Sequence, residues 1–381
     1  MPNPSKSLLN KTQIPFIELR TEPGFQTQVQ ERWREALHKS QFIGGPALTE
    51  LETKILDFTR AAHFIPCANG TDAMQIALRA VGIGVGDKVL LPDFTFWATY
   101  EAVVNVGALP VMVDISPLDL QMDFRLCERA ILEHKPKAVL LVHLYGWCSK
   151  DLQDFRDLCT KYQIPLVEDA AQAMGTRYLG QSVFQEAQIA TTSFYPAKVL
   201  GAAGDAGGIF CHDAELASLC RKLSNHGRAA HYGHDQIGWN SRLDEMQAIF
   251  LSESLNHLSD RIDSRLASEK FYHQRYTTAM PLKMLTCPPE IRGNGYLQVS
   301  LAHTSYQELS GKLKDFGIGT GNVYPSPISA QPGALNPILV SEDRVTYEIA
   351  PRIINLPLFP YMTTVELEYV CACLRKLGLG S

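Results

Sequence analysis

Three features are missing from this sequence, and each absence excludes a class of protein. No segment approaches the roughly 18 uninterrupted apolar residues of a membrane-spanning helix, and the first residues show no charged leader followed by an apolar core. The sequence also lacks a dense block of lysine and arginine, and its net charge is −5. We therefore expect a cytoplasmic protein that binds neither membranes nor nucleic acid.

The cysteines lack a pattern as well. The nine of them include no CxxC pair, and the single CxC, at Cys371 and Cys373, falls on an expected helix where the two side chains point in different directions. Scattered thiols of this kind are typical of small buried hydrophobes in a reducing compartment. The sequence predicts neither a disulfide framework nor a metal site.

The length and the alternation of patterns predict an α/β enzyme-sized protein. With 381 residues and 45% apolar content, the chain can bury a large core in about two or three domains. Between residues 64 and 212, short β-branched runs alternate with helical patterns. Because parallel strands need covered crossovers, this alternation predicts a three-layer α/β/α domain with a mostly parallel, seven-stranded sheet. The expected strands are 64–67, 89–91, 109–115, 138–143, 166–168, 189–194 and 207–211.

The segments on either side of this domain have different patterns. Residues 1–30 are polar and contain prolines, and we expect them to form an arm with an extended piece at 14–19. Helical periodicity runs from Leu243 to about Tyr276, and the spacing of Thr363 and Glu366 is that of a capping box at the start of a last helix. The predicted parts are an arm over 1–30, a large domain over 31–250, and a long helix with a smaller α+β domain over 251–381.

A lysine lies in a segment of small and mostly uncharged residues. The segment is 191–208, TTSFYPAKVLGAAGDAGG, and the lysine is Lys198. A lysine in such a run either packs its stem on an apolar surface while its ammonium reaches water, or is kept for its nitrogen. The segment alone leaves both interpretations open.

A second motif joins a strand to a helix through glycine. The strand ends at Cys67, and Gly70 and Thr71 then lead into a helical pattern. The N–H groups at such a helix start, together with the helix dipole, can bind a phosphate, and Thr71 can add its hydroxyl. The alternative is a plain helix start in which Thr71 or Asp72 forms the N-cap.

A third motif brings carboxylates to the end of a buried strand. The apolar run at 166–167 is followed by Glu168 and Asp169. The carboxyl edge of a parallel sheet is where ligands bind in α/β folds. Asp169 can hold the proton on a ring nitrogen of a ligand, or it can cap the helix that follows.

Together, these groups are the parts that pyridoxal 5′-phosphate requires. Phosphate donors at 70–72 and at Ser193 can anchor one end of this cofactor. Asp169 can keep the ring nitrogen protonated, while Lys198 holds the aldehyde as a Schiff base. A flat aromatic side chain is expected over the ring, and the sequence offers two of them, Phe96 and Trp97.

The motifs also resemble a known family, the nucleotide-sugar aminotransferases of the DegT or StrS type. The resemblance implies the aspartate-aminotransferase fold, which is fold type I of the enzymes that use pyridoxal 5′-phosphate. The matches run in order along nearly the whole chain. They include FIGGP at 42–46, NGTDA at 69–73, DFTFWAT at 93–99, VHLYG at 142–146, VEDAAQA at 167–173, SFYPAKVLGAAGDAGG at 193–208, GWNSRLDEMQA at 238–248 and LPLFPYMT at 356–363.

The resemblance implies a role for each matching residue. Lys198 looks like the Schiff-base lysine and proton shuttle, and Asp169 looks like the partner of the pyridine nitrogen. Asn240 resembles a residue that reaches the phosphate from the second subunit, which implies a homodimer with shared active sites. Arg242 and Tyr324 are candidates on the substrate side. The other implied cofactor contacts are Gln172 at the ring hydroxyl, Phe96 stacked on the ring, and Gly70, Thr71, Asp72 and Ser193 at the phosphate.

The implied reaction has two halves. L-glutamate leaves its amino group on the cofactor, and a nucleotide-linked keto-sugar then collects it, for lipid A, polysaccharide or amino-sugar biosynthesis. The run 240–244, NSRLD, resembles members that act on 3-keto sugars, so C3 of a UDP- or dTDP-linked hexose is the expected position. A 4-keto sugar or a cyclitol stays open as the acceptor, and a regulator that binds the cofactor without turnover is the alternative outside the enzymes.

Overall fold

The computed structural model describes residues 13–230, 232–335, 337–341 and 344–378, and its main element is an eight-stranded sheet. The strand order is β1-β9-β8-β5-β4-β2-β3-β13. Each of the seven expected strands is present, and the predicted fold class is confirmed. These strands are β1 (His63–Cys67), β2 (Lys88–Pro92), β3 (Leu109–Val113), β4 (Ala138–Val142), β5 (Leu166–Asp169), β8 (Ile189–Ser193) and β9 (Gly207–Cys211).

The sheet is mostly parallel. Strand β9 pairs antiparallel with both β1 and β8, while β8, β5, β4, β2 and β3 pair parallel in that order. The eighth strand, β13 (Ile338–Leu339), was not expected, and it adds parallel to β3 at the edge. The carboxyl ends of the parallel strands therefore meet along one edge of the sheet.

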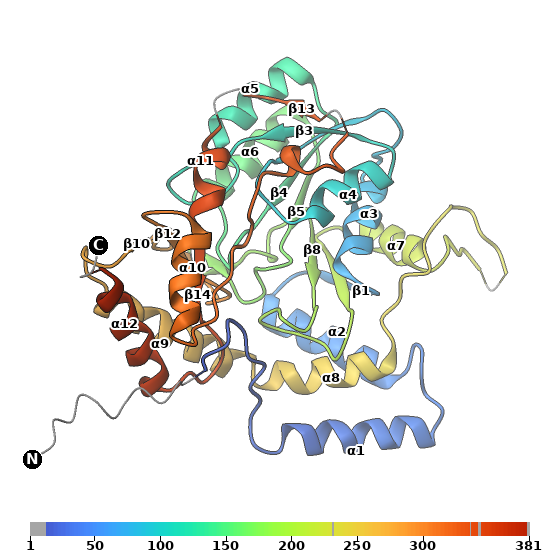
Figure 1. Cartoon of the computed structure of the whole chain (residues 1–381). Coiled ribbons are helices and arrows are strands. Elements are labelled where there is room, and N and C mark those ends of the chain that lie inside the picture. The colour runs from blue at the N-terminus through green and yellow to red at the C-terminus, as the bar shows by residue number, and fades with distance from the viewer. Residues whose placement is uncertain (1–12, 231, 336, 342–343, 379–381) are drawn as a thin grey trace, which may run out of the picture.

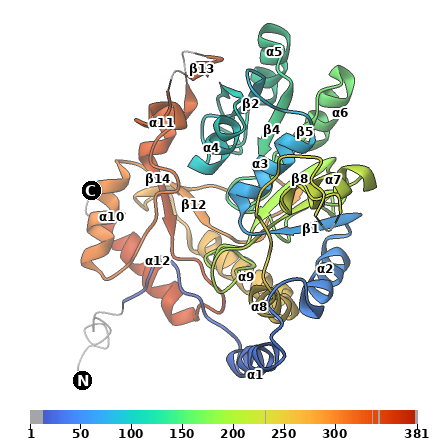
Figure 2. The same cartoon turned by 90° about the vertical axis from the view of Figure 1, so that its right-hand side faces the viewer.

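Helices cover both faces of the sheet, as Figures 1 and 2 show. Successive strand residues point to opposite faces, so Leu90 enters one apolar core while Val89 and Leu91 enter the other. The face of Leu90 is covered by α2 (Pro46–Thr59), α5 (Phe124–His134), α6 (Leu152–Tyr162) and α8 (Glu245–Asn256). The face of Val89 and Leu91 is covered by α3 (Gly70–Ala80), α4 (Trp97–Asn105) and α7 (Ala214–Ser224).

The C-terminal part is a smaller α+β unit with its own apolar core. A three-stranded antiparallel sheet, β10 (Leu282–Met284), β12 (Gln298–Ala302) and β14 (Ile353–Leu356), packs with α9 (Leu258–Arg275), α10 (Tyr306–Asp315) and α12 (Thr364–Gly378). The expected capping box opens α12, because Thr363 N donates to Glu366 Oε2 and Glu366 N donates to Thr363 Oγ1. Figure 1 shows α10 and α12 on the opposite side of the molecule from α3 and α7.

Short elements complete the fold. A small sheet joins β6 (Arg177–Tyr178), β7 (Gln181–Ser182) and β11 (Ile291–Arg292), and α11 (Val345–Ile349) precedes β14. Two 3₁₀ turns span Ile328–Ala330 and Ala350–Arg352. Within the described part of the chain, no helix combines the length and the apolar content that crossing a bilayer requires.

The helical stretch expected from Leu243 to about Tyr276 is two helices, because the chain breaks at His257. His257 has φ −108° and ψ 0°, and its N–H donates to the carbonyl of Ser254. Helix α8 packs on α1 (Phe25–His38) and α2, whereas α9 packs on α12. The sequence shows no proline or glycine between Leu243 and Tyr276, so no local signal indicates the change of packing partner.

The start of the described chain lies against the C-terminal unit. Ile14 pairs parallel with Ile318, and Arg20 and Glu22 bind Glu366 and Arg261 respectively. Helix α1 begins at Phe25, before residue 30 where the arm was expected to end. Residues 1–12 of the predicted arm lie outside the described residues, and the division at 30 and 250 stays a prediction.

Candidate active site

A cavity of about 340 Å³ lies at the carboxyl edge of the parallel strands. Its floor comes from residues that end or directly follow β4, β5 and β8, namely His143, Asp169 and Ser193. A second wall comes from the C-terminal part, through Tyr296 and Tyr324. The cavity therefore depends on both halves of the chain.

Most of the residues predicted for the site line this cavity. They are Gly70, Thr71, Phe96, Asp169, Gln172, Ser193, Lys198 and Tyr324. Asp72, Asn240 and Arg242 were also predicted, and they are not among the lining residues of this chain. The residues of these motifs are far apart in sequence, and the fold gathers them because their strands end at one edge.

The N-terminus of α3 points N–H groups toward the cavity. Asn69 forms the N-cap, since its Oδ1 accepts from Asp72 N at 2.8 Å, and its carbonyl accepts from Ala73 N. The alternative cap by Thr71 or Asp72 is therefore not what forms. The N–H groups of Gly70 and Thr71 belong to the first turn, which has no intrahelical acceptor for them, so they remain for an anion.

Asp169 ends β5 and is 4% exposed. Its Oδ1 accepts from Ala171 N at 3.1 Å, and its Oδ2 accepts from Thr99 Oγ1 at 3.0 Å. Burial raises the pKa of Asp169, and these hydrogen bonds, together with the charge of Lys198, oppose that rise. A protonated ring nitrogen placed against this carboxylate would compensate its burial.

Lys198 lies across the cavity in the turn after β8 and is half-buried. Its Nζ lies 5.1 Å from the centre of the Tyr296 ring, and within the described residues no carboxylate forms a salt bridge with it. Lysines that serve structure alone are usually paired or solvated. Because this nitrogen has no salt-bridge partner, we favour the interpretation in which it reacts with a ligand.

Gln172 links the two walls of the cavity. Its Oε1 accepts from Tyr145 N at 2.6 Å, and its Nε2 donates to the hydroxyl of Tyr324 at 3.0 Å. The Phe96 ring lies 5.8 Å from the ring of Tyr324 and is 56% exposed, so one face of it is free to stack on a flat ligand. Trp97, the other aromatic candidate, packs on Tyr100 and does not line the cavity.

Asn240 and Arg242 are exposed, and they lie in the segment just before α8. Asn240 pairs with Asn225 in a β-bridge, and Arg242 donates to Asn225 Oδ1 at 3.4 Å. Neither side chain is brought to the cavity of its own chain. Their predicted contacts with a cofactor and a substrate would need a second subunit.

Three further residues around the cavity were not predicted from the sequence. Thr99 holds Asp169, Tyr296 lies under Lys198, and His143 is fully buried in the lining. His143 Nε2 lies 2.8 Å from Oε2 of Glu168, and its Nδ1 has no partner among the described residues. Thr99 and His143 lie in motifs that the resemblance had already used, DFTFWAT and VHLYG, but no local pattern indicates their partners.

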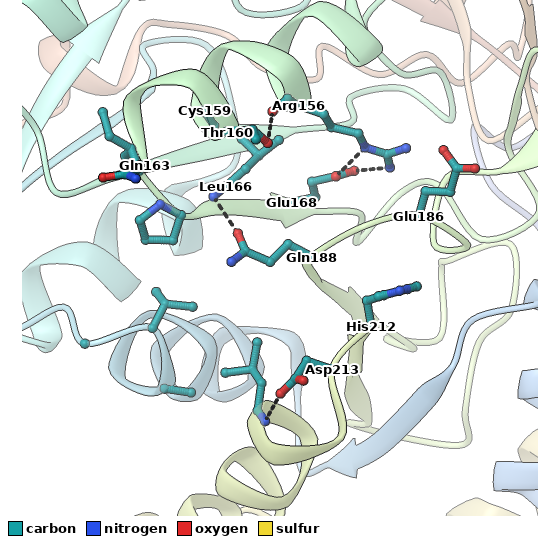
Figure 3. A pocket seen from close by; sticks show the side chains of 16 residues that line it. Arg156, Cys159, Thr160, Gln163, Leu166, Glu168, Glu186, Gln188, His212 and Asp213 are labelled. Carbon is teal, nitrogen blue, oxygen red and sulfur yellow. Dashed lines mark hydrogen bonds and ion pairs between the residues drawn. The ribbon is translucent and has the colours of Figure 1, made fainter.

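A larger and more open cavity, of about 1080 Å³, lies at the opposite edge of the sheet, where β5 begins. Figure 3 shows Arg156 facing Glu168 there, with Glu186 beside the guanidinium and His212 farther from it. Arg156 binds both oxygens of Glu168, at 3.0 and 3.1 Å. The cavity contains none of the predicted site residues, and its arginine is already paired with Glu168, so the smaller cavity is the active-site candidate.

The smaller cavity fits pyridoxal 5′-phosphate, the cofactor expected from the sequence. Among the described residues, the N–H groups of Gly70 and Thr71 have no acceptor and Lys198 has no ion-pair partner, while the Asp169 carboxylate is buried. The phosphate of the cofactor would accept from the two N–H groups, and its protonated ring nitrogen would pair with Asp169. Its aldehyde would bind the amine of Lys198. Within the described residues, no group of three or more His, Cys, Asp or Glu side chains is arranged to hold a metal ion.

Comparison with known proteins agrees with this fit. Residues 24–375 match the DegT/DnrJ/EryC1/StrS aminotransferase family. The chain is 36% identical over 372 residues to a UDP-2-acetamido-2-deoxy-3-oxo-D-glucuronate aminotransferase of Pseudomonas aeruginosa, covering 95% of this chain and 100% of that protein. It is also 36% identical over 362 residues to a pleiotropic regulatory protein of Geobacillus stearothermophilus, covering 94% and 96%.

A solved structure shows the same fold over nearly the whole length. The crystal structure of S. venezuelae DesV superposes with a TM-score of 0.91 at 31% identity and covers 96% of this chain and 98% of that one. The chain therefore belongs to the DegT/DnrJ/EryC1/StrS aminotransferase family, and it is an aminotransferase that depends on pyridoxal 5′-phosphate.

Proposed function

We propose that this aminotransferase moves the amino group of L-glutamate to a nucleotide-linked keto-sugar, at C3 of a UDP- or dTDP-linked hexose. The observation that carries the proposal is the pair of Lys198 and Asp169 in one cavity between the two halves of the chain. The position on the sugar is supported by the run 240–244, and by the Pseudomonas relative, whose name specifies a 3-oxo sugar. The product would be an amino sugar for lipid A, a polysaccharide or a glycosylated metabolite.

Seven of the lining residues have a proposed task at the cofactor. Bound pyridoxal 5′-phosphate supplies a sink for the electrons of the substrate α-carbon. Asp169 keeps the ring nitrogen protonated, and Lys198 Nζ carries the proton between carbon centres. The remaining contacts are those of Gly70, Thr71 and Ser193 with the phosphate, Phe96 with the ring face, and Gln172 with the ring hydroxyl.

Tyr296 and Tyr324 are proposed to separate Lys198 from bulk water. Both line the cavity from the C-terminal part, and the Tyr324 hydroxyl is held by Gln172. Burial holds the pKa of Tyr324 well above its ordinary value, so its hydroxyl stays protonated at neutral pH. A neutral hydroxyl at this position can donate a hydrogen bond to a substrate oxygen.

The active site is proposed to be completed by a second copy of the chain. Among the described residues that line the cavity, Lys198 is the single lysine or arginine, whereas glutamate and a nucleoside diphosphate carry several negative charges. Asn240 and Arg242 lie exposed and away from the cavity of their own chain. In a homodimer they would supply the missing contacts across the interface.

Exposed apolar side chains near this segment support the dimer. Ile43 pairs with Asp244 in a β-bridge, so the 42–43 loop lies beside the start of α8. Phe42 is 47% exposed, Ile43 57% and Ile237 90%. Exposed large apolar side chains beside Asn240 and Arg242 in sequence or in space are what an interface between copies would cover.

We also propose that the enzyme works in the cytoplasm. All nine cysteines are unpaired thiols, and eight of them are buried. Burial raises the pKa of several of these thiols, Cys127 and Cys148 among them, and so keeps them unreactive. Unpaired thiols in this number are typical of a reducing compartment.

Product analysis with a panel of acceptors tests the function. Purified enzyme with L-glutamate would be given UDP- and dTDP-linked 3-keto and 4-keto hexoses and a keto-cyclitol. We expect 2-oxoglutarate and a 3-amino nucleotide sugar. Amination of only the 4-keto sugars would move the position to C4, and amination of only the cyclitol would contradict a nucleotide-linked acceptor.

The regulator alternative has a specific observation in its favour, because one relative is named as a regulatory protein. Lys198 and Asp169 stand against it, since both line one cavity and a regulator without turnover needs no lysine to carry a proton. The two functions differ in one half-reaction. A regulator would bind the cofactor and release no 2-oxoglutarate from L-glutamate.

A further inference from the structure

Asp169 has a neighbour that none of the proposed tasks uses, the hydroxyl of Thr99 in the first turn of α4. Thr99 Oγ1 donates to Asp169 Oδ2 at 3.0 Å, and the Oγ1 atoms of Thr95 and Thr99 lie 2.9 Å apart. Thr95 is 2% exposed and Thr99 0%. Because Thr95 lines the cavity, two buried hydroxyls connect the cavity wall to the carboxylate.

The chemistry of hydroxyls fixes the direction of this chain. Each threonine has one proton to donate, and an ionised carboxylate has none. When Asp169 is ionised, Thr99 must therefore donate to it, and the oxygen of Thr99 is left to accept the proton of Thr95. The order of donation is Thr95 to Thr99 to Asp169, which resolves the donor of the 2.9 Å contact.

The hydrogen bond from Thr99 opposes the rise in the pKa of Asp169 that burial causes. Burial raises the pKa of this carboxyl, while the N–H of Ala171 and the hydroxyl of Thr99 stabilise its charged form. The titratable groups facing Asp169 are Lys198 after β8, His143 after β4, and Tyr324 in the C-terminal part. Of the neutral groups, Thr99 is the side chain that binds the carboxylate directly.

Thr99 also fixes the orientation of the carboxylate. Ala171 N binds one oxygen and Thr99 binds the other, so rotation of the group would break at least one of the two hydrogen bonds. An oxygen that accepts one such bond keeps a lone pair for another donor. The carboxylate is thus held in one orientation beside the cavity.

We propose that Thr99 is a positioning residue for Asp169, and that Thr95 orients the Thr99 hydroxyl. The inference rests on the proposed contact of Asp169 with the ring nitrogen of the cofactor. Thr99 touches neither substrate nor cofactor and acts only through the carboxylate. Without it, Asp169 is less often ionised and less well directed, and the cofactor is held less firmly.

Four variants of the full-length protein test this role. Thr99→Val removes the hydroxyl and keeps the shape, Thr99→Ser keeps the hydroxyl, and Thr95→Val removes the donor to Thr99. The matched control is Thr191→Val, because Thr191 is 1% exposed, pairs with Asp169 in the register of β5 and β8, and has a hydroxyl without a partner among the described residues. For each variant, the dissociation constant of pyridoxal 5′-phosphate and the pH midpoint of its visible absorbance would be measured.

We expect Thr99→Val to weaken cofactor binding about tenfold or more and to move the pH midpoint by about one unit, as the loss of a hydrogen bond to a charged group predicts. Thr99→Ser should restore both values, Thr95→Val should give a smaller change in the same direction, and Thr191→Val should match the wild type. A folded Thr99→Val with wild-type binding and midpoint would overturn the inference. If that variant does not fold, wild-type values in Thr95→Val would overturn the hydroxyl chain.

Asp169→Asn separates this inference from the function on which it rests. Weak cofactor binding in Asp169→Asn together with wild-type binding in Thr99→Val would overturn the role of Thr99 alone. Wild-type binding and midpoint in Asp169→Asn would overturn the contact between Asp169 and the ring nitrogen, and the role of Thr99 with it.

Discussion

Gly70 at the start of α3 packs so closely on Ser193 at the end of β8 that a Cβ on Gly70 would lie 2.8 Å from the Cβ of Ser193. Carbon atoms in ordinary contact are about 3.5–4.0 Å apart. In Gly70→Ala, either the helix start or the strand end must therefore move, and both are proposed to hold the phosphate. We expect the affinity for pyridoxal 5′-phosphate to fall about tenfold, measured by titration of the visible absorbance, because overpacking costs about 1–3 kcal/mol.

Gly84→Ala is the matched control for this prediction. A Cβ on Gly84 would meet nothing within 4 Å, and its backbone does not require glycine. Its cofactor affinity should equal that of the wild type. Equal affinities in Gly70→Ala and Gly84→Ala would contradict a close contact of the phosphate with the start of α3.

The sequence was sufficient for seven strands of the main sheet, and eight of its eleven candidate site residues line the cavity. Each strand of the main sheet except β13 is a run of at least four residues, buried on both faces, and such runs are visible in sequence. Strand β13 has two residues, and its pairing with β3 depends on a chain segment more than two hundred residues away, so no local pattern indicates it. The break at His257 is hidden for a related reason, because it reflects a change of packing partner.

In the site, too, positions at strand ends can be predicted from local sequence, whereas contacts between distant segments cannot. Lys198, Asp169 and Gly70 lie where strands end, and strand ends can be located from sequence. Thr99 binds a carboxylate 70 positions away, and His143 binds one 25 positions away, so their partners depend on the finished fold. A plain cap by Thr71 or Asp72 was the alternative to a phosphate site, but α3 already begins at Gly70, so Asn69 is the residue in position to cap it.

The ion pair of Arg156 and Glu168, drawn in Figure 3, should be important for the stability of the fold. Glu168 is fully buried; burial alone would raise its pKa, but Arg156 and His143 hold that pKa below its ordinary value. Arg156→Ala would leave this charge without its main partner, and we expect the free energy of unfolding to fall by about 3–5 kcal/mol. Urea denaturation of the loaded enzyme measures this.

A surface ion pair is the control for Arg156. Arg292 pairs with Asp263 at 2.6 Å, and both side chains are at least half exposed. Arg292→Ala should cost at most about 1 kcal/mol. If Arg156→Ala is as mild as Arg292→Ala, Glu168 does not depend on Arg156 for its burial.

Acid should weaken the attachment of the N-terminal segment. Partial burial opposes the ionisation of Glu22, but hydrogen bonds from Arg261 and Tyr361 lower its pKa to about 2, and the Arg20 hydrogen bond lowers that of Glu366 to about 2. A pKa lower in the folded state than its ordinary 4.5 contributes stability that is present above pH 4.5 and is lost as the pH falls toward 2. Thermal melting at a series of pH values measures this loss.

Glu22→Gln should reduce that dependence on pH. The variant lacks the carboxylate, so we expect it to be less stable than the wild type at pH 7 and to lose less stability between pH 4.5 and 2. Glu31→Gln changes an exposed carboxylate on α1 and should follow the wild-type curve. Parallel curves for wild type and Glu22→Gln would show that the Arg261 pair contributes nothing to acid sensitivity.

Mixing two defective chains tests the shared active site. In a heterodimer of Lys198→Ala and Asn240→Ala, one site receives both defects and the other receives none, if Asn240 acts across the interface. After reversible dissociation and random pairing, about one quarter of the sites should be intact, as twofold symmetry requires. Verified heterodimers without any gain in activity over the separate variants would rule out a shared site.

The visible spectrum of the purified chain with pyridoxal 5′-phosphate, before and after L-glutamate, tests the central claim most directly. We predict that the wild type develops a visible band that changes when L-glutamate is added, and that Lys198→Ala lacks the wild-type band. A wild type that stays colourless with the cofactor, or a Lys198→Ala variant with the same band and the same response to L-glutamate, would contradict the account.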